Sequence, residues 1–103
     1  MNIQKMMKQV QQAQQRMAAV QEELASKTVE ATAGGGMVKV VMTGDGALRS
    51  ISLEREVVDP EDIDMLQDLI VAAVNEGKRR ASELAAAEMQ KAAGTMGLPP
   101  GLI

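Results

Sequence analysis

The sequence predicts an α+β fold in which a helix, three antiparallel strands and a second helix follow one another, α-β-β-β-α. Two long stretches, one at each end of the chain, space their apolar residues as helices do. Between them lies a short segment rich in β-branched residues, divided by glycine groups at residues 34–36 and 44–46. Glycines between short apolar runs are typical of hairpin turns, so the middle of the chain is expected to form a three-stranded meander.

The first helix is predicted over residues 2–26. Its apolar residues recur at alternating spacings of three and four, the 3.5-residue repeat of a coiled-coil contact. Seven glutamines lie between them, and glutamine favours helix without carrying charge. We call this narrow line the N-terminal seam; it comprises Ile3, Met6, Val10, Ala13, Met17, Val20 and Leu24.

Strands are predicted over residues 28–33, over 37–43 and from 47 to 53 or 54. The second helix is predicted from residue 60 to about 93, with Asp59 as its cap and Pro60 at its first position. Residues 69–74 are apolar all round, which indicates a helix covered on more than one side. We expect residues 1–94 to form a single domain and residues 95–103, with their glycines and prolines, to form a flexible tail.

Element lengths predict the architecture. Strands of this size span roughly 23 Å, whereas the two helices span roughly 37 Å and 50 Å. Both helices therefore run past the sheet, as an antiparallel projecting pair, and the sheet edges stay open to pairing. A homodimer is the simplest way to bury these surfaces. We expect its core and dimer contacts at Val38, Val40, Met42, Ile51, Leu53, Leu66, Leu69 and Ile70.

Composition excludes several classes of site. The chain has no His, Cys, Phe, Tyr or Trp, so it lacks the usual neutral-pH base, the thiol nucleophile, common metal ligands and base-stacking rings. The acids at positions 59–68 suit capping better than metal binding, and the triple glycine lacks the Lys-Ser/Thr of a phosphate loop. We expect no catalytic residue, cofactor, metal or small-molecule substrate. With no apolar run of membrane-spanning length, we expect a cytoplasmic protein and no membrane partner.

The net charge of −3 hides a strong asymmetry. Residues 45–76 carry nine acids and two bases, whereas residues 1–27 and 77–103 each carry four bases and two acids. Four bases have no acid three or four positions away on their helix, namely Lys5, Lys8, Arg16 and Lys78. In an antiparallel pair, Lys8 is expected about level with residues 78–80. From the residues alone, these bases could form an ordinary solvated surface or a DNA-binding surface. The residues of the DNA-binding surface would be Lys5, Lys8, Arg16, Lys78, Arg79, Arg80 and Lys91.

Several motifs occur in a specific order along nearly the whole chain. A Gln- and Met-rich helix is followed by Gly34-Gly35-Gly36-Met37-Val38-Lys39-Val40, Gly44-Asp45-Gly46, Val58-Asp59-Pro60-Glu61, residues 66–75 and a Gly-Leu-Pro-Pro-Gly tail. This order resembles the YbaB/EbfC family of bacterial nucleoid-associated proteins. The resemblance implies a tweezer-like homodimer that binds duplex DNA with its helices. One departure is Gly77, where the family usually has Ala, which indicates either a flexible point or a close approach.

We therefore expect a non-enzymatic, nucleoid-associated protein that organises or bridges chromosomal DNA. The alternative is a prefoldin-like helical chaperone or protein–protein adaptor, against which three strands and the unpaired bases argue. The sequence leaves open any base preference, RNA binding, the existence of a protein partner, oligomers beyond the dimer and the choice of basic residues that contact phosphate.

Overall fold

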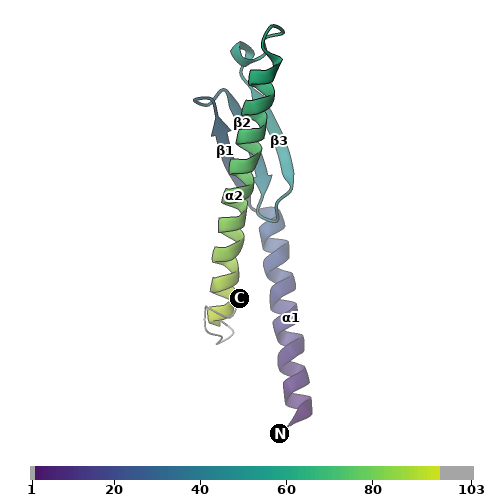
Figure 1. The fold of residues 1–103 in the computed structure, drawn as a ribbon. Helices are drawn as coiled ribbons and strands as arrows, with labels where there is room; N and C mark the ends of the chain where they lie inside the picture. Colours follow the sequence, from purple (N-terminus) through teal and green to yellow (C-terminus); the bar gives the residue numbers. More distant parts are fainter. Residues whose placement is uncertain (1, 96–103) are drawn as a thin grey trace.

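A computed structural model describes residues 2–95 of the chain. Helix α1 (Ile3–Ser26) leads into strands β1 (Thr28–Ala33), β2 (Val38–Thr43) and β3 (Leu48–Leu53). A short 3-10 turn (Arg55–Val57) then precedes helix α2 (Ile63–Thr95). The strands form one antiparallel sheet in the order β1-β2-β3, so the predicted meander between two helices is confirmed. The molecule is elongated, about 70 × 21 × 17 Å (Figure 1).

Helix α1 begins and ends with ordinary capping contacts. The Asn2 side chain accepts a hydrogen bond from the Lys5 backbone N–H at 3.2 Å, and the Lys27 N–H donates to the Glu23 and Leu24 carbonyls. Of its residues, only Val20 and Leu24 are fully buried. They pack with Ala92 and, around it, with Leu84, Ala85 and Met89 of α2. The predicted seam therefore meets a partner helix only over its C-terminal part.

The core lies between α2 and one face of the sheet. Val38, Val40 and Met42 alternate along β2 and are at most 1% exposed, and Ala31 of β1 and Ala73 of α2 are buried with them. The side chains of Leu66, Leu69, Ile70 and Val74 close the cluster from α2. Because α2 packs on β1 and β2, the third strand contributes no fully buried residue.

At Gly77, helix α2 approaches the sheet closely. A Cβ added there would lie 2.7 Å from Met42 Sδ and 3.1 Å from Val40 Cγ2. Real Cβ atoms do not come so near, so a side chain at this position would require the Met42 and Val40 side chains of β2 to shift. Of the two readings of Gly77, the structure supports close approach.

The turns use their glycines for different purposes. Gly34, Gly35 and Gly36 all have positive φ, between 64° and 93°, which L-residues with a side chain rarely adopt. Gly44 instead donates its N–H to the carbonyls of Leu24 and Lys27, both at 2.9 Å. These two bonds join the β2–β3 turn to the end of α1, and so fix where that helix leaves the sheet.

The start of α2 differs from the prediction. The helix begins at Ile63, and Asp62 is its cap, its Oδ1 accepting from the Met65 N–H at 3.2 Å. Asp59 caps a separate turn, because its side chain accepts from the Glu61 N–H at 2.9 Å and its carbonyl from the Asp62 N–H at 3.0 Å. This turn, in which an Asp side chain accepts from a backbone N–H two residues on, is an Asx turn. Asp both caps helices and forms Asx turns, so the sequence-based prediction placed the start of α2 too early. At the other end, α2 passes Gly94 and reaches Thr95; the tail predicted over residues 95–103 otherwise lies outside the described residues.

Figure 1 shows how the helices relate to the sheet. The first half of α2 crosses the sheet, and only its second half continues beside α1, antiparallel to it. The N-terminal part of α1 then extends beyond the end of α2. The projections are therefore unequal in length, because α2 uses about half its residues to cover the sheet. None of the described helices is long and apolar enough to cross a membrane.

Candidate nucleic-acid interface

The N-terminal half of α1 carries positive charge and no acid. Lys5, Lys8 and Arg16 lie on a helix whose first acidic residue is Glu22. Within residues 2–95, neither Lys5 nor Lys8 makes an ion pair, and both are exposed. Arg16 does have an interaction within the fold. The overhanging part of α1 thus presents two solvated ammonium groups with no carboxylate beside them on the helix.

The predicted level of Lys8 is wrong. Lys78 lies beside the β2–β3 turn and the last turns of α1, lining a hollow with Gln21, Gly44 and Asp45. Lys8 is more than three helical turns from Gln21 along α1, roughly 20 Å away. The prediction assumed that α2 projects from the sheet near residue 60, whereas α2 first crosses the whole sheet. The basic residues consequently spread along the projection and do not form one band.

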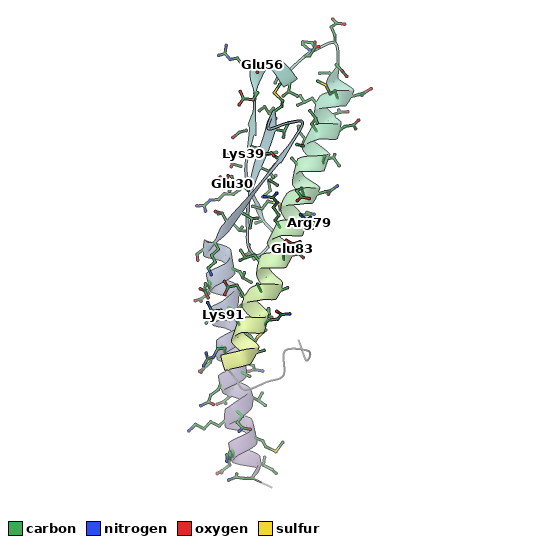
Figure 2. All side chains as sticks on the ribbon, turned by 90° about the vertical axis from the view of Figure 1, so that its left-hand side faces the viewer. Glu30, Lys39, Glu56, Arg79, Glu83 and Lys91 are labelled. Atoms are coloured by element: carbon green, nitrogen blue, oxygen red, sulfur yellow. The ribbon has the colours of Figure 1, made fainter. Side chains whose placement is uncertain are left out.

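Arg79 and Arg80 are largely occupied by acids of their own helix. Arg79 donates from Nε to Glu76 Oε2 at 3.1 Å and also pairs with Glu83. Figure 2 shows Arg79 and Glu83 together on α2. Arg80 Nε lies 3.2 Å from Glu76, and its Nη1 donates to the Glu30 carbonyl of β1 at 2.9 Å. Hydrogen bonds from Arg79 and then Arg80 lower the pKa of Glu76 to about 2. These pairs are the ones that helical spacing favours, and the charge of both arginines is compensated locally.

The structure brings Arg16 and Lys91 together. Both line a hollow between α1 and α2, with Val20, Glu23 and Glu88. Sequence spacing predicts that Glu88 pairs with Lys91, three residues on. Glu88 is instead bonded to Lys27, the residue that caps the end of α1, and Lys27 also lies 3.2 Å from Glu23. Among the described residues, Lys91 makes no ion pair.

Sequence reasoning missed the role of Lys27. Its spacing from Glu23 predicts a pair along α1, but nothing local shows that it reaches Glu88, 61 residues away. The hydrogen bond from Lys27 is the main cause of a lowered pKa at Glu88, whose side chain is only 12% exposed. Lys27 thus joins the two helices electrostatically at the base of the projection, where they leave the sheet.

Exposed apolar side chains continue the core onto β3. Ile51 lies opposite Val40, and Leu53 lies opposite Val38, so both point to the side of the sheet that α2 covers. Each is nevertheless 41% exposed, and Leu48, opposite Met42, is 45% exposed. The same sheet face is therefore buried on β2 and open on β3.

Acidic residues gather at the opposite end from Lys5 and Lys8. Residues 54–68 hold seven acids and one base, and they lie where α2 begins, at the far end of the sheet. Figure 2 labels Glu56 at that end and Lys91 on the projection. In the part of the chain that the structure describes, no group of three or more His, Cys, Asp or Glu side chains is placed to hold a metal. Charge thus divides the molecule along its length.

Comparison with known proteins identifies a family. The chain matches the model of the YbaB/EbfC DNA-binding family over residues 1–96. A nucleoid-associated protein of Syntrophobacter fumaroxidans is 59% identical over 100 residues, which cover 93% of this chain and 91% of that protein. One from Acetivibrio thermocellus is 54% identical over 101 residues, covering 98% and 89%.

The fold also occurs among solved structures. The crystal structure of an uncharacterized protein from Helicobacter pylori superposes with a TM-score of 0.73 and covers 81% of this chain and 87% of that one. Its sequence identity is 22%, so this likeness speaks for the fold alone. The family description and the names of the relatives are those of DNA-binding, nucleoid-associated proteins and not of enzymes.

Proposed function

We propose, from the premise that this chain belongs to the YbaB/EbfC DNA-binding family, that its projecting helices bind duplex DNA mainly through phosphate contacts. The observation that carries the proposal is the acid-free stretch of α1, where Lys5 and Lys8 stay exposed. A surface with cations and no neighbouring carboxylate attracts a polyanion, because no internal pair must be broken first.

The basic residues differ in what they offer to a phosphate. Lys5, Lys8, Lys78 and Lys91 make no ion pair within residues 2–95, so they are the strongest candidates. Arg16 adds a guanidinium beside Lys91. Arg79 and Arg80 would have to share their charge with Glu76, so their contribution should be smaller.

We further propose that the working unit is a homodimer. The open apolar surface of Leu48, Ile51 and Leu53 lies beside the buried residues of β2 and is continuous with the core. A second copy would cover it, and a dimer would carry two pairs of projecting helices. Two DNA-binding projections on one particle suit an architectural role, in which the protein organises or bridges chromosomal DNA. The names of the relatives support a place at the nucleoid.

Salt dependence tests the contact. A dimer offers two copies of Lys5, Lys8, Lys78 and Lys91, and we expect about half to contact phosphates at once. Each contact contributes about −0.9 to the slope of log affinity against log salt, which predicts a slope of roughly −3 to −4. The measurement is a titration of labelled duplex DNA at several salt concentrations. Affinity that is independent of salt would contradict phosphate contact, and strong preference for one sequence would contradict backbone recognition.

One observation favours a second candidate function. Ile3, Met6, Met7 and Val10 of α1 are 48–68% exposed, and exposed apolar helix surfaces also serve chaperones or adaptors. Gel shift with duplex DNA, run beside suppression of aggregation of an unfolded client, separates the two. Suppression without a gel shift would favour the chaperone.

A further inference from the structure

Glu88 has a choice between two lysines. Lys91 follows it by three positions on α2, where helix side chains are neighbours, and Lys27 approaches it from the end of α1. The structure resolves this choice in favour of Lys27, which contacts Glu88 and also Glu23. Lys91 keeps an exposed ammonium group at the rim of the hollow between the helices.

Both lysines act electrostatically on Glu88. Glu88 is mostly enclosed, its pKa is lowered first by the hydrogen bond from Lys27, and the charge of Lys91 also acts on it. Glu88 is therefore an ionised carboxylate within the field of Lys91. If Lys27 were absent, the nearest cation on the same helix would be Lys91, and an ion pair with it would form at that spacing.

From this geometry we propose that Lys27 is a positioning residue for DNA binding: by engaging Glu88, it leaves Lys91 available to a phosphate. The inference rests on the proposed function, in which duplex DNA contacts the projecting helices. Lys27 itself is not the contact, because two carboxylates already share its ammonium group. Its effect on DNA is exerted through Glu88 and Lys91.

The test compares variants that carry the same charge in different places. Lys27→Gln should weaken duplex binding about threefold to tenfold at low salt, the range for one or two surface charge contacts per dimer. It should also make the slope of log affinity against log salt shallower by about 1 to 2. Adding Glu88→Gln should restore affinity to within about twofold of the parent, because no carboxylate then competes for Lys91. Lys27→Arg, which keeps a cation at Glu88, should bind as the parent does.

The matched control is Lys27→Gln with Glu30→Gln, since Glu30 lies on the sheet and pairs with Lys39 at 3.6 Å. This variant has the parent's net charge but leaves Glu88 without Lys27, so its affinity should stay reduced. In a Lys91→Gln background, Lys27→Gln should have little further effect on affinity or salt slope. All variants are measured as full chains, with melting temperature and mass recorded alongside.

Outcomes separate this inference from the function on which it rests. A parent protein that binds no duplex overturns the proposed function and this inference with it. If the parent binds but Lys27→Gln binds equally well, the positioning role is wrong and the DNA-binding function stands. Equal rescue by Glu30→Gln would show that net charge alone matters, and it would also overturn the role of Lys27. Failure of Glu88→Gln to rescue a folded variant would do the same.

Discussion

The sheet-covering half of α2 and the N-terminal half of α1 are both regular helix, yet they bury very different surfaces. On α2, Ala73 has no exposed surface and Gly77 lies against β2. On α1, Ile3 and Val10 are more than half exposed, and the first buried residue is Val20. Helix α2 is held by the core, whereas α1 is held by its own backbone bonds and by a contact near its C-terminal end.

The two regions also differ in charge. Residues 54–68, beside the sheet, are strongly acidic, and residues 3–21 of α1 carry no acid. Stability therefore resides where DNA would be repelled, and the cations lie where little packing depends on them. The comparison teaches that folding and binding are separable in this chain, so substitutions in one region should leave the other property nearly unchanged.

The largest expected effect is at the open side of the sheet. Ile51→Lys places a charge on the apolar face beside α2 and should convert a dimer of about twice 11.0 kDa into monomer or unfolded chain. Ser50→Lys is the matched control, because Ser50 lies opposite Val41, on the other face of β3. Light scattering coupled to size exclusion measures the mass. A dimer that survives Ile51→Lys would place the interface elsewhere.

A smaller effect is expected where α2 approaches the sheet closely. Alanine in place of glycine favours a helix by about 1 kcal/mol, but at Gly77 the new Cβ would collide with Met42 and Val40. Overpacking costs about 1 to 3 kcal/mol, so after the gain in helix propensity Gly77→Ala should leave the protein less stable by up to about 2 kcal/mol. At Gly94 nothing lies within 4 Å of the added Cβ, so Gly94→Ala should be neutral or slightly stabilising. Urea unfolding of both variants checks the sign, and stabilisation by Gly77→Ala would contradict the close approach.

The smallest expected effect is on stability at acidic pH. The arginines hold the pKa of Glu76 at about 2, below its ordinary 4.5, so the folded protein binds fewer protons there than the unfolded chain between these values. Stability from this group is present above pH 4.5 and is lost as pH falls towards 2. Between pH 5 and pH 3, the free energy of unfolding should fall less for Glu76→Gln than for the parent. Equal losses would mean that the pair contributes nothing.

The fold was largely predictable, because each element is encoded locally. The first strand was predicted with its observed bounds, and the other elements within one to three residues. The start of α2 was misplaced because Asp59 and Asp62 have the same capping chemistry, and only three-dimensional structure shows which one caps the helix.

The candidate interface was predictable only in part. Pairs within one helix, such as Arg79 with Glu76 and Glu83, follow from spacing. Contacts between helices do not, since they depend on how far α2 travels over the sheet before it meets α1. That distance determines that Arg16 and Lys91 line one hollow and that Lys27 reaches Glu88, and no local pattern encodes it.

The most direct test of separable folding and binding is the duplex affinity of a Lys5→Gln, Lys8→Gln variant, measured with its stability at matched salt. Glutamine keeps the helix propensity, and neither lysine makes an ion pair within residues 2–95. The free energy of unfolding should change by less than about 0.5 kcal/mol, as for ordinary surface substitutions. Affinity should fall for every duplex, with a salt slope shallower by about 2 or more. Unchanged affinity would contradict the assignment of α1 as the contact surface.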